Sequence, residues 1–86
     1  MTVAEVKKLV GNKKLIVGAE RTIKELKRGQ LKKIFISSNC SEGARETIEI
    51  NARLFKVEVS HLDVSNEELG IIMKKPFAVS VISLLQ

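Results

Sequence analysis

The sequence contains one cysteine, one histidine and no tryptophan or tyrosine. Cys40 has no second cysteine for an internal disulfide, and together with His61 it cannot complete a zinc site. The three phenylalanines are too few for the aromatic platforms that bind single-stranded nucleic acid. No catalytic triad, phosphate-binding loop or metal-ligand spacing occurs. We therefore expect neither an enzyme nor a bound cofactor or metal, and we interpret Cys40 as incidental and His61 as a partly exposed structural residue.

Long hydrophobic runs are also missing. No run approaches the roughly 18 apolar residues of a membrane span. The first ten residues include Glu5, Lys7 and Lys8, so they lack the apolar segment of a signal peptide. The chain has 86 residues, of which 44% are hydrophobic and 29% charged, a balance typical of one folded domain. These features predict a single cytoplasmic domain over residues 1–86, without a membrane partner.

Positive charge is concentrated in the first part of the chain. The formal net charge is +5 and the isoelectric point is about 9.6. Residues 7–33 hold ten lysines and arginines against two acids, a balance of +8, and the other residues hold five against eight, a balance of −3. This asymmetry predicts an anionic partner such as nucleic acid. The alternative is a lysine-rich helix face that is merely solvated.

Capping residues and periodic apolar positions predict four helices alternating with four strands. Thr2 and Ser65 each begin a capping box, with Glu5 and Glu68 three residues later. Glycine, proline and runs of β-branched residues mark the other boundaries. The predicted helices cover residues 3–10, 19–28, 41–55 and 66–73, and the predicted strands cover residues 15–17, 34–37, 57–59 and 77–85.

This alternating order predicts an α/β fold with helices on both faces of one sheet. The first three strands, each followed by a helix, are expected to run nearly parallel, whereas the last strand can enter antiparallel. The clearest helix carries Ala44, Ile48, Ala52 and Phe55 at spacings of four, four and three. We expect these four side chains to face the core.

In such sheets, functional groups gather beyond the carboxyl ends of the strands. The candidate junctions are residues 18–22, 37–40 and 63–66. Gly18 allows the backbone to approach a ligand closely, and the free N–H groups of the following helix favour an anion. The alternative is that Gly18 only makes a tight turn.

Basic and amide side chains flank the first two junctions. Lys24, Lys27 and Arg28 share the helix that begins after Gly18, and we predict that they contact a phosphate backbone, although each alone fits an ordinary surface cation. The Asn39 amide is suited to reading a base edge, and Ser38 beside it offers a further donor and acceptor. Alternatively, Ser38 or Asn39 only begins the turn before the next helix.

Segments along nearly the whole chain match one family in order and spacing. They are residues 17–29, 33–39, 49–54, 66–70 and 77–83, and they include VGAERTIK, KIFISSN and FAVSVIS. Together they resemble the archaeal and eukaryotic large-subunit ribosomal protein L30e family. The sister L7Ae family carries an Asn-Glu-x-x-Lys motif, of which Lys24 matches, while Glu20 and Arg21 replace its Asn and Glu.

The resemblance implies a three-layer α/β/α sandwich with a four-stranded mixed sheet. It also implies a structural protein of the large ribosomal subunit that recognises a kink-turn, a sharply bent RNA internal loop with sheared G·A pairs. The RNA would meet the glycine-containing turn with the helix after it, the asparagine-bearing loop, and the loop before the last strand. The predicted RNA-binding residues are Gly18, Ala19, Glu20, Arg21, Lys24, Lys27, Arg28, Ser38, Asn39, Lys74, Lys75 and Phe77.

Several alternatives remain open from the sequence. The resemblance places Phe77 against an exposed RNA base, and the local pattern fits a core residue at the start of a strand equally well. The protein is expected to be a monomer when free and to sit among neighbouring ribosomal proteins when assembled. A second RNA-binding hypothesis is a stand-alone kink-turn protein that serves a guide-RNA particle or regulates an RNA. A small enzyme or phosphate-ligand domain at the same sheet edge is disfavoured, because the chain lacks an acid–base set.

Overall fold

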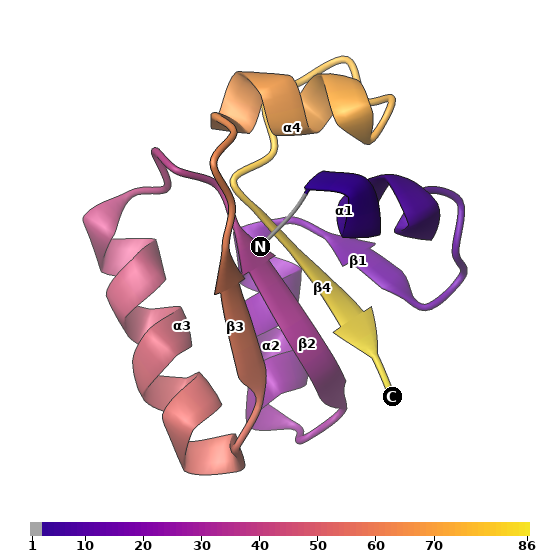
Figure 1. Cartoon of the computed structure of the whole chain (residues 1–86). Helices are drawn as coiled ribbons and strands as arrows, with labels where there is room; N and C mark the ends of the chain where they lie inside the picture. Colours follow the sequence, from indigo (N-terminus) through magenta and orange to yellow (C-terminus); the bar gives the residue numbers. More distant parts are fainter. Residues whose placement is uncertain (1–2) are drawn as a thin grey trace.

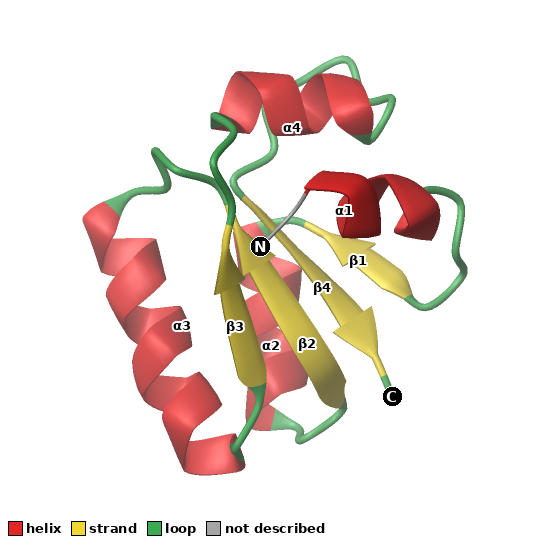
Figure 2. Ribbon diagram, in the orientation of Figure 1, coloured by secondary structure: helices red, strands yellow, loops and turns green. Residues whose placement is uncertain are grey.

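The computed structural model describes residues 3–86, in which four helices alternate with four strands (Figure 1 and Figure 2). Thr2, the predicted N-terminal cap, lies outside the described residues. Ser65 caps its helix as predicted, because its side chain accepts a hydrogen bond from the Glu68 backbone. The elements in chain order are α1 (Val3–Leu9), β1 (Leu15–Val17), α2 (Ala19–Lys27), β2 (Leu31–Ile36), α3 (Glu42–Phe55), β3 (Glu58–His61), α4 (Asn66–Ile72) and β4 (Val81–Leu85).

The strands form one mixed sheet in the order β1-β4-β2-β3. β2 and β3 are parallel, and β4 is antiparallel to both β1 and β2, which confirms the expected strand directions. The carboxyl ends of β1, β2 and β3 therefore lie at the same edge as the start of β4. We call this edge, at the upper end of the sheet in Figure 1, the strand-end edge.

Helices cover both faces of the sheet, so the three-layer α/β/α sandwich is confirmed. Leu26 of α2 and Ile48 of α3 pack with one set of strand residues, and Val6 of α1 and Leu69 of α4 pack with the other. Thr22 is a buried polar residue of α2, and its hydroxyl lies 2.9 Å from that of Ser83 in β4. This pairing satisfies both hydroxyl groups in the core.

β2 begins three residues earlier than predicted, and Lys33 explains why that start was missed. A lysine inside a strand usually signals an exposed edge, yet the Lys33 side chain is only 15% exposed. Its ammonium lies 2.7 Å from Glu5 of α1 and 3.1 Å from Glu58 of β3. An irregularity in the β2–β4 pairing between Leu31 and Lys33 leaves Lys32 exposed and Leu31 buried.

Two other expectations were wrong. The last strand begins at Val81 rather than at residue 77, because the chain from Phe77 first follows α4. Val79 N–H donates to the Asn66 carbonyl there, and a Cβ added to Gly70 of α4 would overlap the Phe77 carbonyl. Phe77 is consequently not a core residue at a strand start but lies in a loop, 58% exposed. Phe55 does not face the core fully either, being 44% exposed at the end of α3.

Candidate nucleic-acid interface

Backbone hydrogen bonds hold the predicted RNA-binding loops together at the strand-end edge. Gly18 N–H donates to the Val81 carbonyl at 2.9 Å, and Ser37 N–H donates to the Ser80 carbonyl at 2.8 Å. Ser38 N–H donates to the Val64 carbonyl at 2.8 Å. These bonds connect the junctions after β1, β2 and β3 with the segment that enters β4. Segments distant in sequence thus form one surface.

Gly18 occupies a backbone conformation that only glycine adopts easily. It stands at the N-cap position of α2 with φ +116° and ψ +147°, a combination that strains any L side chain. A Cβ built at this position would have no atom of residues 3–86 within 4 Å, apart from its chain neighbours. The turn therefore favours glycine, and the space in front of the turn is open as well. Both of the alternatives considered for Gly18 are consistent with this geometry.

The basic residues of α2 are spread along the helix. Glu20 and Arg21 are exposed in its first turn, while Ala19 is partly buried against the core. Lys24 is exposed one turn farther along the helix. Lys27 is the last residue of the helix, about 13 Å along the helix axis from Gly18 at 1.5 Å per residue. The structure thus brings Arg21 and Lys24 closer to the strand-end edge than Lys27.

Arg28 follows Lys27 at the far end of α2. Its guanidinium lies 3.2 Å from the Glu25 carboxylate, so part of its charge is already compensated. The three cations that the sequence grouped together therefore differ in their distance from the edge and in their partners.

Asn39 links two of the loops through its side chain. Its Oδ1 accepts from the Asn66 backbone N–H at 2.7 Å, and its Nδ2 donates to Asn66 Oδ1 at 3.0 Å. Asn39 and Ser38 are both exposed. The amide thus attaches the β2–α3 loop to the start of α4, and the second N–H of Nδ2 is available to a ligand.

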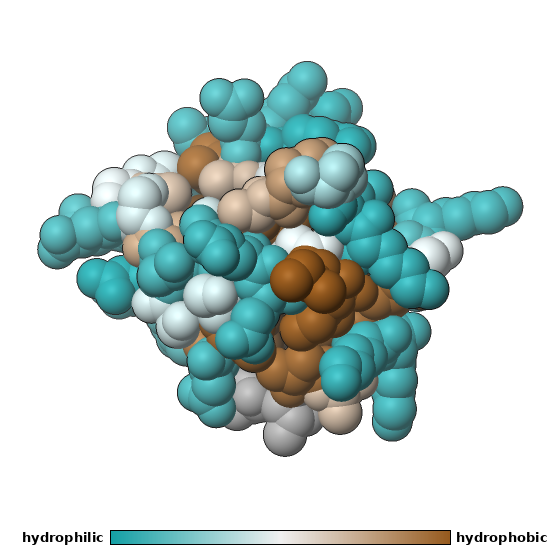
Figure 3. All heavy atoms as spheres, turned by 90° about the horizontal axis from the view of Figure 1, so that it is seen from above, coloured by the Kyte–Doolittle hydropathy of each residue, from teal (hydrophilic) through white to brown (hydrophobic). Residues whose placement is uncertain are grey.

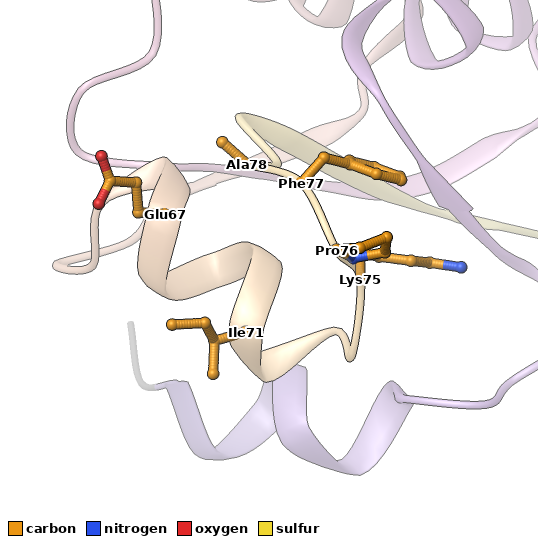
Figure 4. A pocket seen from close by; sticks show the side chains of 6 residues that line it. All are labelled: Glu67, Ile71, Lys75, Pro76, Phe77 and Ala78. Atoms are coloured by element: carbon orange, nitrogen blue, oxygen red, sulfur yellow. The ribbon is translucent and has the colours of Figure 1, made fainter.

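The loop between α4 and β4 contributes apolar side chains and an exposed lysine, Lys75, to this surface. A pocket of about 350 Å³ lies between α4 and this loop, and in Figure 4 Lys75 and Phe77 extend in the same direction, away from α4. Figure 3, which looks down on the α4 end of the molecule, shows an apolar patch bordered by hydrophilic side chains. Ile71 of α4 is 74% exposed. The pocket is lined by Glu67, Ile71, Lys75, Pro76, Phe77 and Ala78.

Asn66, Glu67 and Ile71 belong to this surface although no sequence motif indicates them. Asn66 did fall within a candidate junction, but its partnership with Asn39 spans 27 residues, and no local pattern indicates it. Ile71 stands beside Ile72 and Met73 in one short apolar run, and the run alone does not show which of these side chains faces the core. An exposed apolar residue of this kind is recognisable only once the helix has been placed on the sheet.

Cys40 and His61 carry the reactive side chains considered in the sequence, and the structure shows the surroundings of each. Burial raises the pKa of the Cys40 thiol, and the nearby Arg45 charge offsets only part of that effect, so the thiol is a poor nucleophile near neutral pH. His61 is exposed, as expected, and its Nε2 lies 3.1 Å from a Glu49 carboxylate oxygen. Within residues 3–86 there is no group of three His, Cys, Asp or Glu residues placed to hold a metal ion. No helix in that range is long and apolar enough to cross a membrane.

Comparisons with known proteins agree on one family. The profile described as the ribosomal protein L7Ae/L30e/S12e/Gadd45 family matches residues 2–86. The large ribosomal subunit protein eL30 of Sulfurisphaera tokodaii is 30% identical over 82 residues, which cover 95% of this chain and 77% of the relative. Its counterpart in Methanothermobacter thermautotrophicus is 37% identical over 68 residues, covering 79% and 69% of the two chains.

Solved structures show the same fold. A Bacillus halodurans protein of unknown function superposes with a TM-score of 0.84 at 17% identity, over 98% of this chain and 83% of that one. A Giardia lamblia protein named as a 15.5 kDa RNA-binding protein has a TM-score of 0.76, also at 17% identity, over 94% and 68% of the two chains. At such identities the likeness concerns the fold.

Proposed function

The chain belongs to the ribosomal protein L7Ae/L30e/S12e/Gadd45 family, and we propose that it binds a kink-turn of ribosomal RNA as a structural component of the large ribosomal subunit. Its ribosomal relatives are structural proteins rather than enzymes, in agreement with the absence of catalytic motifs from the sequence. In this proposal the protein acts in the cytoplasm as part of the ribosome, among neighbouring ribosomal proteins.

The observation that supports this proposal most is the meeting of three loops at the strand-end edge. Gly18, Asn39 and Phe77 come from three separate segments, and hydrogen bonds between their loops hold these segments together. A bent RNA presents phosphates, base edges and an unstacked base close together. A rigid surface that offers a contact for each of these groups is suited to recognising such a shape.

Each part of the surface contributes a different kind of contact. The α2 backbone N–H groups behind Gly18, with Arg21 and Lys24 beside them, attract phosphates. The free N–H of the Asn39 amide donates to a base edge. The exposed Phe77 ring packs on a base that leaves the stack. Phosphate contacts determine the position of the RNA, and the other two contacts favour the bent loop over a regular helix.

The experiment is a gel shift with a kink-turn RNA and with a control RNA in which the G·A pairs are replaced by Watson–Crick pairs. We expect tight binding to the first RNA and only weak, salt-sensitive binding to the second. Equal affinity for both would refute kink-turn recognition and leave a general affinity for RNA.

A pair of phenylalanine variants tests whether the strand-end edge carries the binding. Phe77→Ala should weaken kink-turn binding by about 1–3 kcal/mol, the usual contribution of a base stacked on an aromatic ring. Phe55→Ala is the matched control, because Phe55 is also exposed but lies at the far end of α3. If the two variants bind the RNA equally well, Phe77 is not a contact.

A further inference from the structure

A second pocket lies between α1 and α4, beside the strand-end edge. Its volume is about 380 Å³, and Lys7, Val10, Ile72 and Lys74 line it. Val10 and Ile72 are partly buried and pack against the core beneath, so they form an apolar base of defined shape. Lys7 and Lys74 are exposed. This combination of an apolar base and two cations suits a ligand with a sugar and a phosphate.

Neither of the two lysines forms an ion pair with an acidic residue of the described range 3–86. Within residues 3–86, the basic side chains that lie within ion-pair distance of a carboxylate belong to Arg28, Lys33 and His61, and neither Lys7 nor Lys74 is among them. Their ammonium groups therefore leave uncompensated positive charge beside the apolar base of the pocket. An anion that enters the pocket is attracted without first displacing a carboxylate.

The position of Lys74 connects this pocket with the proposed RNA surface. Lys75 lines the apolar pocket next to Phe77, and Lys74 lines the pocket between α1 and α4. The Cα atoms of neighbouring residues are about 3.8 Å apart, so adjacent residues of one loop supply a lysine to each pocket. An RNA strand that contacts Lys75 and continues beyond the bend toward α1 reaches the second pocket.

We propose that the pocket between α1 and α4 binds one ribose-phosphate unit of the RNA held at the strand-end edge. The phosphate lies between Lys7 and Lys74, and the ribose lies against Val10 and Ile72. This inference rests on the proposed function and extends the RNA-binding surface onto α1, a helix that none of the predicted contacts included. It assigns Lys7 and Val10 a role in recognising RNA beyond the bend itself.

The alternative role of these lysines is electrostatic compensation of helix ends. Lys7 and Lys8 both lie in the last turn of α1, where a cation interacts favourably with the helix dipole. Both are exposed, but only Lys7 lines the pocket. Lys7→Gln and Lys8→Gln therefore remove the same charge from the same helix turn, and they differ only in whether the pocket is affected.

The test compares two RNAs that share one kink-turn, one with short stems and one with both stems extended. Kd is measured against KCl for the wild type, Lys7→Gln and Lys8→Gln. The salt slope is the steepness with which the logarithm of the affinity falls against the logarithm of the KCl concentration. On the extended RNA this slope should be smaller by about 0.7–0.9 for Lys7→Gln than for Lys8→Gln, as expected for one lost phosphate contact. A fourfold reduction in KCl then raises the affinity of Lys7→Gln about threefold less than it raises the affinity of Lys8→Gln. On the short RNA the two variants should bind alike.

Each outcome has a separate meaning. If the wild type prefers the kink-turn but Lys7→Gln and Lys8→Gln have equal slopes on the extended RNA, the pocket proposal is overturned while the proposed function stands. If the wild type shows no preference for the kink-turn, the proposed function itself fails.

Inorganic phosphate provides the remaining comparison. If phosphate shifts the amide NMR signals of Val10 and Ile72 while Lys7→Gln leaves RNA binding unchanged, the pocket binds a free anion and does not bind a phosphate group of the RNA.

Discussion

Replacing Gly18 by valine separates the structural and recognition roles of the turn after β1. At φ +116° and ψ +147°, a side chain costs about 1–3 kcal/mol in backbone strain. Steric overlap within the protein adds little, because a Cβ at this position meets no described atom within 4 Å other than those of its chain neighbours. Total stability for 86 residues is about 4–13 kcal/mol. Gly18→Val should therefore remain largely folded while its side chain occupies the space in front of α2.

If the RNA backbone approaches this turn, the valine side chain pushes it away. We expect kink-turn affinity to fall by more than tenfold, about 1.4 kcal/mol, beyond any loss that unfolding explains. Gly29→Val is the matched control, since Gly29 also has a positive φ, of +71°, and open space around it, but follows the far end of α2. Stability is measured by urea unfolding followed by circular dichroism, and affinity by RNA titration of the same preparations. Affinity losses that are equal in the two variants would refute a role for Gly18 in recognition.

Three further changes test neighbouring features. Asn39→Ala should lower the free energy of unfolding by about 1 kcal/mol, because its hydrogen bonds are lost. It should also weaken RNA binding by about 1–3 kcal/mol, because a base contact is lost. Reduced stability with normal affinity in RNA titrations would leave Asn39 only the turn-forming role. Lys24→Gln should reduce the salt slope of RNA binding by about 0.7–0.9 and Lys27→Gln by less, because Lys27 lies farther from the strand-end edge; equal slopes would contradict this order. Burial disfavours the charge of Lys33, but hydrogen bonds to carboxylates that include Glu5 outweigh it and raise the lysine pKa above its ordinary value of 10.5. Glu5→Gln should therefore cost about 0.5 kcal/mol of unfolding free energy at neutral pH, and this difference should vanish as the pH rises above the raised pKa of Lys33. A cost that persists at that high pH in urea unfolding would show that charge is not its source.

The sequence by itself determined the order and approximate extent of the elements. Capping residues such as Ser65, the glycines after the helices and the apolar spacing around Ile48 are local signals, and each acts through a few neighbouring residues. The same locality explains why the strand directions could be predicted. Each short loop and intervening helix leaves the chain few ways to return to the sheet. Local signals also sufficed to predict the basic first part of the chain and the junction at Gly18.

Only the tertiary structure decided which polar residues belong inside and which apolar residues remain outside. Lys33 lies within β2 because carboxylates from α1 and β3 reach its ammonium, and Thr22 is buried because Ser83, 61 residues away, provides a hydroxyl partner. Phe77 was predicted within a strand, but its segment follows α4 because Gly70 leaves room for the chain there. The pairing of Asn39 with Asn66 and the pocket at Lys7 arise in the same way. The burial of a side chain and its hydrogen-bond or ion-pair partners depend on residues distant in sequence. They are therefore determined only when the layers pack, and local sequence patterns do not indicate them.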